Sequence, residues 1–150
     1  MPFLTEHDAA VVRDRLAREM VHPVTLEFYA PTTSGLALPT DDGQIAEYVR
    51  QILAEVAALS PLVTVVPIST LAEPERARAR GIACTPATAV LGAQDYGLRF
   101  YGMPAGYEFA TLLEMIVAAS RGRGDLSPRT REVLERLPGE AHIRVFVTPT

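Results

Sequence analysis

Residues 97–120 read GLRFYGMPAGYEFATLLEMIVAAS, and this stretch decides the fold. The first six residues, GLRFYG, predict a short strand bounded by glycines. Gly102, Pro104 and Gly106 then predict a turn, because glycine permits positive φ and proline fixes the bend. The remainder predicts a helix over 108–120 with one apolar face. The residues expected on that face are Phe109, Leu112, Leu113, Ile116 and Val117.

A second strand precedes GLRFYG along the chain. The segment ATAVLG, at 87–92, is separated from it by the four residues AQDY. Two short apolar runs at this spacing predict an antiparallel hairpin with a slightly long loop.

The first 60 residues predict a helix, a strand and a second helix. Thr5 and Asp8 have the spacing of a capping box, and apolar residues recur after them at helical intervals up to Met20. Residues 22–30, HPVTLEFYA, break this period and predict a strand. After a loop, Asp41 or Asp42 is expected to cap the second helix. Its inward face is expected to carry Ile45, Val49, Ile52, Val56 and Leu59.

Two further elements precede the hairpin. PLVTVVPI, at 61–68, is nearly all apolar and predicts a strand buried on both faces. A short charged helix is expected at about 72–80. Its arginines are interpreted as a solvated face paired with Glu73 and Glu75; they are Arg76, Arg78 and Arg80.

Without the first helix and the C-terminal tail, the order is strand, helix, strand, helix, strand, strand, helix. The first two strands are joined through a helix and should be parallel, whereas the last two form a hairpin. The sequence therefore predicts an α/β fold of the thioredoxin-like kind, a mixed four-stranded sheet flanked by helices. An extra N-terminal helix and a C-terminal helix–strand appendage complete it.

The composition is that of a soluble globular protein. The chain has 150 residues, of which 48% are hydrophobic and 21% charged, and its net charge of −4 argues against nucleic acid as a partner. It has no apolar run of the length that a membrane helix needs, and charged residues interrupt its N-terminal segment as they would not in a secretory signal. A cytoplasmic location is expected.

Missing residue types exclude several chemistries. All 14 basic residues are arginine, so no phosphate-loop or Schiff-base lysine is present. The single cysteine, Cys84, allows neither an intrachain disulfide nor a CxxC dithiol. Three histidines are scattered without ligand spacing, so no metal site and no cofactor are expected.

One short sequence occurs twice. LEFYAPT at 26–32 and RVFVTPT at 144–150 share Phe, Pro and Thr at equivalent positions, and each follows an amphipathic helix with a Thr or Ser cap. Such self-similarity indicates duplication. The expected organisation is a thioredoxin-like unit at 1–120, a linker at 121–127, and the first helix and strand of a second, truncated unit at 128–150.

The segment RFYGMPAGYEF, at 99–109, resembles a motif of tandem-thioredoxin proteins. These are the protein disulfide oxidoreductases of thermophilic prokaryotes and the N-terminal domain of the alkyl hydroperoxide reductase F subunit. Tyr107 stands where many of these proteins have histidine. CTPAT, at 84–88, is similar to the family segment with a cis-proline, which implies a substrate groove at Thr85 and Pro86. The resemblance covers nearly the whole chain.

The resemblance also implies where a dithiol would lie. In the family the second unit carries the CxxC, directly after a strand similar to VFVTPT. A CxxC in the first unit would follow LEFYA, where this chain has Thr33, Ser34 and Ala37 instead. The implied active loop is therefore vestigial, and no catalytic residue is expected there.

Three hypotheses follow for function. The first is a redox-inert first unit of a disulfide oxidoreductase, whose partner is a second thioredoxin-like unit or a protein disulfide substrate. The second is a standalone binding or dimerisation module, such as a homodimer, with residues 128–150 docked or exchanged between protomers. The third is a one-cysteine peroxidase or thiol transferase that uses Cys84. Burial of Cys84 as a small apolar side chain is the expected alternative to reactivity. Whether the chain is an enzyme is left open.

Overall fold

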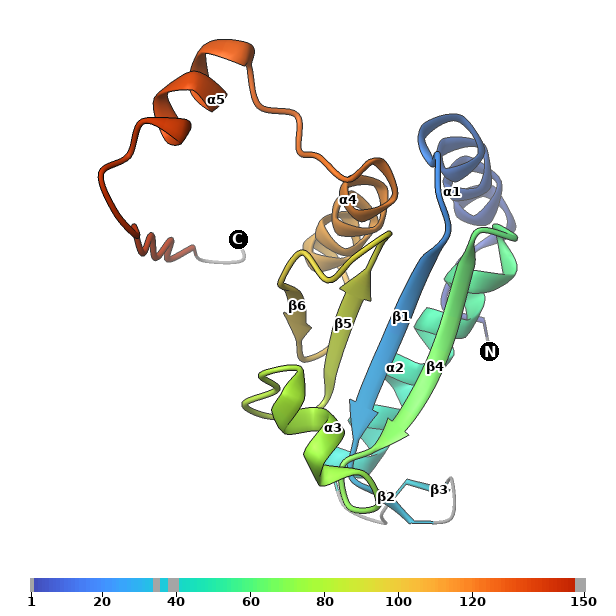
Figure 1. The fold of residues 1–150 in the computed structure, drawn as a ribbon. Coiled ribbons are helices and arrows are strands. Elements are labelled where there is room, and N and C mark those ends of the chain that lie inside the picture. The colour runs from blue at the N-terminus through green and yellow to red at the C-terminus, as the bar shows by residue number, and fades with distance from the viewer. Residues whose placement is uncertain (1, 34–35, 38–40, 148–150) are drawn as a thin grey trace.

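A computed structural model describes residues 2–33, 36–37 and 41–147, with only the backbone described at 33, 36, 37, 41 and 42. The central sheet has the strand order β4-β1-β5-β6 (Figure 1). β1 pairs in parallel with β4 and antiparallel with β5, which pairs antiparallel with β6. The predicted mixed four-stranded sheet and its hairpin are therefore confirmed. The strands are β1 (Val24–Ala30), β4 (Val63–Ser69), β5 (Ala87–Leu91) and β6 (Leu98–Tyr101), and a separate small hairpin is formed by β2 (Thr32–Thr33) and β3 (Leu36–Ala37).

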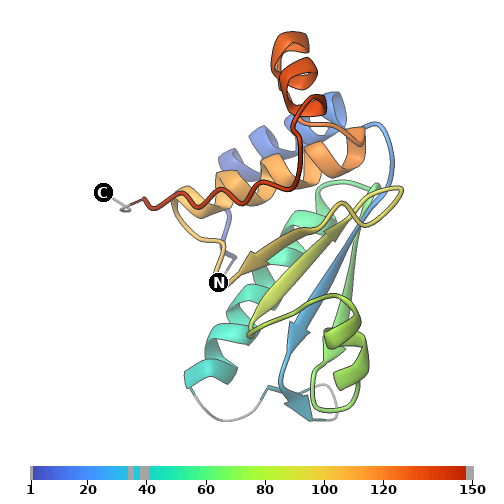
Figure 2. The same cartoon turned by 60° about the vertical axis from the view of Figure 1, so that its left-hand side comes forward.

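Helices cover the two faces of the sheet unequally. One face packs against three helices: α1 (Glu6–Glu19), α2 (Asp41–Ala58) and α4 (Tyr107–Arg121). On the opposite face, the short α3 (Pro74–Ala79) is the only helix among the described residues, as Figure 2 shows. Each face of the sheet has its own hydrophobic core, the larger one under the three helices and the smaller one under α3. Successive side chains of β1 point to opposite faces, so Leu26 and Phe28 enter the larger core and Tyr29 enters the smaller one.

The predicted helices are confirmed with two corrections. α2 begins at Asp41, so Asp41 and Asp42 lie within its first turn and neither is the capping residue that was predicted. The side chain of Thr5 caps α1 by accepting from the amide of Asp8, and α4 buries four of its five predicted core residues while Phe109 is partly buried. In α2, Ile45 is 41% exposed, contrary to prediction, and Ala46 is buried in its place. Ala46, Val49 and Leu53 lie three and four residues apart and form the buried stripe, which leaves Ile45 outside it.

The prediction that β4 is buried on both faces is wrong. β4 is an edge strand, with Thr64 and Pro67 exposed. Proline fits this position, since it has no N–H to donate and is confined to sheet edges. A continuous apolar run gives no information on strand order, so the sequence could not distinguish an edge strand from a central one.

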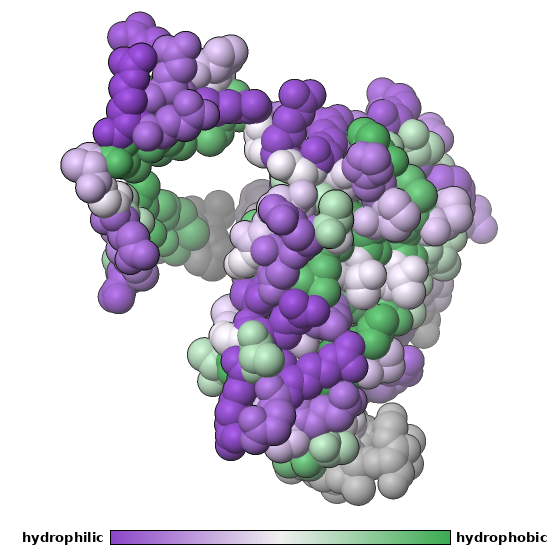
Figure 3. Space-filling view, viewed as in Figure 1, coloured by the Kyte–Doolittle hydropathy of each residue, from purple (hydrophilic) through white to green (hydrophobic). Residues whose placement is uncertain are grey.

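The predicted C-terminal strand is also absent from the described residues. α5 (Pro128–Glu135) forms as expected, but residues 141–147 have no regular structure, and every residue from 122 to 147 is exposed. α5 and the tail stand apart from the body of the unit (Figure 1), and hydrophobic side chains lie on their surface (Figure 3). A lone segment without a partner strand cannot form a ladder, which explains the difference. Residues 148–150, in the predicted strand, lie outside the described residues.

Candidate functional site

Two loops meet at one end of the sheet. β1 ends at Ala30 and β5 begins at Ala87, and these strands are antiparallel neighbours with Tyr29 opposite Ala87. The segment after β1 and the segment before β5 therefore emerge side by side. These segments contain all the site residues predicted from the sequence.

The segment after β1 forms the small β2–β3 hairpin. Its register pairs Thr32 with Ala37 and Thr33 with Leu36. Two of the three predicted loop positions, Thr33 and Ala37, thus lie on two strands that pair with each other. The third, Ser34, lies outside the described residues.

The segment before β5 contains the other predicted residues. The Thr85–Pro86 peptide bond is cis, Pro86 is buried, and its carbonyl accepts a hydrogen bond from the amide of Gly102 at 2.9 Å. Cys84 is exposed, so the expected burial of this side chain is wrong. The reason is its position in a loop between α3 and β5, where neither layer of the core reaches it.

A buried acidic residue that the sequence analysis missed lies on β1. Glu27 is 4% exposed and accepts three hydrogen bonds beneath α3. Arg76 Nη2 donates to its Oε1 at 2.7 Å, and Arg80 Nε donates to its Oε2 at 2.8 Å. The hydroxyl of Tyr29 donates to the same Oε2 at 2.8 Å.

These contacts keep Glu27 charged. Burial alone would raise the pKa of Glu27, but the hydrogen bonds from Arg76, Arg80 and Tyr29 outweigh it and hold the pKa below its ordinary value. Burial and the neighbouring carboxylate raise the pKa of Tyr29 to about 12. Both groups therefore keep one protonation state near neutral pH, and neither is suited to proton transfer there.

The arginine face of α3 is only partly as predicted. Arg76 pairs with Glu73, and Arg78 pairs with Glu75. Arg76 and Arg80 also reach the buried Glu27, so they do more than cover a solvated surface. Two signals were available in the sequence: an acidic residue inside an apolar strand, and two arginines four residues apart on one helix face.

Hydrogen bonds extend this charged cluster to the β5–β6 hairpin. Asp95 pairs with both Arg80 and Arg99 and accepts from the amide of Gly97. The Arg99 guanidinium, followed by the Gly97 amide and Arg80, holds the pKa of Asp95 well below its usual range. The cluster thus joins β1, α3 and the hairpin loop through paired charges.

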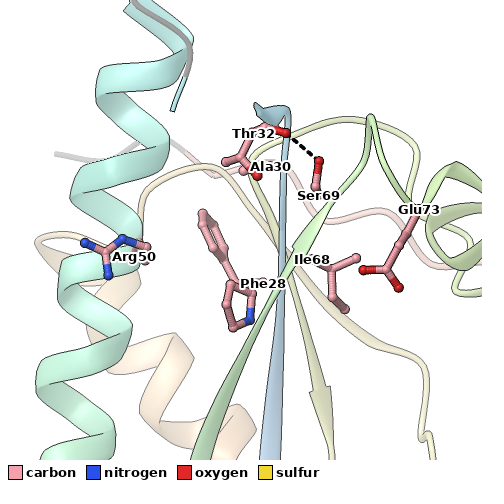
Figure 4. A pocket seen from close by; sticks show the side chains of 8 residues that line it. Phe28, Ala30, Thr32, Arg50, Ile68, Ser69 and Glu73 are labelled. Atoms are coloured by element: carbon pink, nitrogen blue, oxygen red, sulfur yellow. Dashed lines mark hydrogen bonds between the residues drawn. The ribbon is translucent and has the colours of Figure 1, made fainter. Parts of the chain in front are cut away.

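A recess of about 360 Å³ lies on the β4 side of the same sheet end (Figure 4). The side chain of Ser69 closes one wall by donating to the carbonyl of Thr32 at 2.6 Å. The charged groups at its rim already have partners, Arg50 with Glu47 and Glu73 with Arg76. The recess is lined by Phe28, Ala30, Thr32, Arg50, Pro67, Ile68, Ser69 and Glu73.

The part of the chain that the structure describes has neither a metal-binding cluster nor a membrane-spanning helix. Within it, no group of three or more His, Cys, Asp or Glu side chains could hold a metal ion. None of its helices has both the length and the apolar character required to cross a membrane.

Comparison with models of protein families found no match, and comparison with curated proteins found none either. Solved structures do match. The alkylhydroperoxide reductase AhpF of Enterococcus faecalis gives a TM-score of 0.75 at 21% identity, over 91% of this chain and 62% of that one. A crystal structure of the NTD_N/C domain of the same reductase gives a TM-score of 0.71 at 20% identity, over 91% of this chain and 62% of that one. A protein disulfide oxidoreductase from Aeropyrum pernix gives a TM-score of 0.71 at 22% identity, over 93% of this chain and 57% of that one.

These likenesses establish the fold. The chain has a thioredoxin-like fold of the kind found in the reductase N-terminal domain and in the disulfide oxidoreductase. It spans less than two thirds of the length of each of these structures.

Proposed function

We propose that this chain is the redox-inert first unit of a tandem-thioredoxin disulfide oxidoreductase of the cytoplasm. In this role it supports thiol–disulfide exchange carried out by a second thioredoxin-like unit on protein disulfide substrates. One observation carries the proposal. A thioredoxin-like fold is combined with a single cysteine, Cys84, and the chain has no cysteine in the loop after β1.

The chemistry of disulfide exchange explains why one cysteine is not enough. A thiolate attacks a disulfide and forms a mixed disulfide, which a second thiol must resolve. Cys84 has no second thiol in this chain, so attack by it would stop at the mixed disulfide. Glu27 is charged and paired with two arginines, and its lowered pKa makes it a poor base for activating a thiol at neutral pH.

The assignment of residues 128–150 to a second unit rests on their likeness to α1 and β1. Ser127 caps α5 as Thr5 caps α1, and Phe146 repeats Phe28. Phe146 is nevertheless 89% exposed, and Val145 and Val147 are exposed as well. Large apolar side chains gathered at a surface indicate a site of contact with other protein. A second unit would provide the strands and helices that cover them.

The test of redox inertness is insulin reduction with dithiothreitol as the reductant. The chain is expected to give no turnover above the reductant alone, and Cys84→Ser should give the same trace. Turnover that Cys84→Ser abolishes would overturn the proposal and favour the one-cysteine transferase.

A second candidate is a binding or dimerisation module, and the exposed apolar tail favours it too. In that case residues 128–147 of one protomer contact a second copy. Sedimentation equilibrium separates the two candidates. A monomer at all concentrations supports the first-unit proposal, whereas a dimer that disappears on deletion of 141–150 supports the module.

A further inference from the structure

The segment between α4 and α5 has a composition that usually gives flexibility. Residues 121–131, here called the joint, contain Gly122, Gly124 and Pro128. Glycine-rich linkers normally behave as random coils. The joint differs, because hydrogen bonds hold both of its ends and an ion pair spans its first half.

The first end is a defined helix terminus. Gly122 has a left-handed conformation, with φ 67°, and its amide donates to the carbonyls of Ala118 and Ala119. The amide of Arg123 also donates to Ala118, at 3.2 Å. A left-handed glycine at the end of a helix, with these hydrogen bonds, gives the chain a defined direction as it leaves the helix.

Arg121 connects the joint to the body of the unit. Its Nε donates to the carbonyl of Glu19, the last residue of α1, at 2.9 Å. Its Nη1 lies 3.7 Å from a carboxylate oxygen of Asp125, in the middle of the joint. One half-buried side chain at the end of α4 thus contacts both α1 and the middle of the joint.

The far end is tied back in the same way. The side chain of Ser127 accepts from the amide of Thr130 at 3.1 Å, and Pro128 occupies the first helical turn. Arg131, on α5, donates from Nη2 to the carbonyl of Gly124 at 3.1 Å. This bond restrains the backbone of residues 125–130, between Gly124 and Arg131. Rotation about the two glycines is opposed by the contacts that span them, the Arg121–Asp125 pair and the bond from the amide of Arg123 to Ala118.

We propose that the joint fixes the direction in which α5 leaves the unit. All residues from 122 to 147 are exposed, so packing of α5 against the body does not set this direction. Exposed ion pairs are weak one by one. In the joint, however, the ion pair and the arginine hydrogen bonds add to helix caps that already fix the backbone at both ends. That the joint orients a second thioredoxin-like unit rests on the proposed function.

A distance measurement between two spin labels tests the proposal on the chain itself. Cys84 is exposed on the body and is the only cysteine, and Glu132→Cys adds a second site on α5. Pulsed electron double resonance should give one narrow distance distribution. Replacing residues 122–127 by glycine and serine creates a random coil and should broaden the distribution by about twofold or more.

Point variants test whether the contacts of Arg121 and Arg131 are what keeps the distance distribution narrow. Arg121→Ala with Arg131→Ala should broaden the distribution toward that of the glycine–serine chain. The matched control is Arg129→Ala with Arg136→Ala, which removes the same number of positive charges. In the described residues neither of these side chains makes a hydrogen bond or an ion pair. This control should leave the width unchanged.

Two results would overturn the proposal: a parent distribution as broad as that of the glycine–serine chain, or a double variant as narrow as the parent. Since Arg121 also contacts α1, Arg131→Ala alone provides a variant that leaves the body untouched, and it should broaden the distribution by a smaller amount. The readout involves neither a dithiol nor a second unit. Its failure is therefore distinct from failure of the insulin test.

Discussion

Two regions of this chain have the same pattern and opposite burial. α1 followed by β1, and α5 followed by residues 141–147, each pair a capped helix with an apolar, β-branched segment. Phe28 on β1 is 3% exposed, whereas Phe146 at the equivalent position is 89% exposed. The pattern is thus compatible with both outcomes.

The two regions differ in their neighbours. β1 lies between β4 and β5 and pairs with both, and three helices cover one of its faces. Residues 141–147 pair with no strand in the described part of the chain. An apolar strand sequence therefore becomes a strand only where other elements provide partners for its backbone and a cover for its side chains.

The largest expected effect compares the two phenylalanines directly. Phe28→Ala leaves a cavity in the core and should lower the free energy of unfolding by about 3–5 kcal/mol. Phe146→Ala removes an exposed ring and should change it by no more than about 0.5 kcal/mol. Urea unfolding followed by circular dichroism measures both. A large loss for Phe146→Ala would mean that the tail is packed in solution.

A second difference lies next to each phenylalanine, where the first region has Glu27 and the second has Val145. Glu27→Val should lower the free energy of unfolding by about 2 kcal/mol, because it removes the buried partner of Arg76 and Arg80 while both arginines can still reach solvent. Glu73→Val is the matched control, since it removes only the exposed partner of Arg76 and should cost less than about 0.5 kcal/mol. Equal losses would show that burial of Glu27 is unimportant.

The charge of Glu27 should also appear in the pH dependence of stability. Its pKa is lower in the folded than in the unfolded chain, so its stabilisation is fully present above the ordinary pKa of 4.5. The stabilisation is lost as the pH falls through the lower pKa of the folded state. The parent should therefore lose more free energy of unfolding than Glu27→Gln between about pH 6 and about pH 3. Identical losses would contradict the pairing with the arginines.

The smallest expected effect concerns the two helix caps. Thr5→Ala removes a cap from a helix packed in the core and should lower the free energy of unfolding by about 1 kcal/mol. Ser127→Ala should leave global stability unchanged and reduce only the helicity of α5, which chemical shifts of its Cα atoms report. A global loss for Ser127→Ala would show that α5 is coupled to the body.

Local patterns explain what could be predicted from the sequence. The Thr5 cap, the β5–β6 hairpin and the apolar face of α4 each depend on residues a few positions apart, so sequence spacing was sufficient. The edge position of β4 and the burial of Glu27 depend on segments about 40 or more residues away. Residues 141–147 are exposed because no strand among the described residues pairs with them. The periodicity of a sequence does not show which distant segments become neighbours, so it could predict none of these three features.

Hydrogen exchange of β1 and of the tail tests the central claim most directly. The account predicts slow exchange at residues 24–30 and exchange as fast as in an unfolded chain at 141–147, at every protein concentration. This result fits a first unit whose residues 141–147 have no partner strand among the described residues. Protection at 141–147 that increases with concentration would contradict it, because a second copy would then cover the tail and the chain would be a dimerisation module.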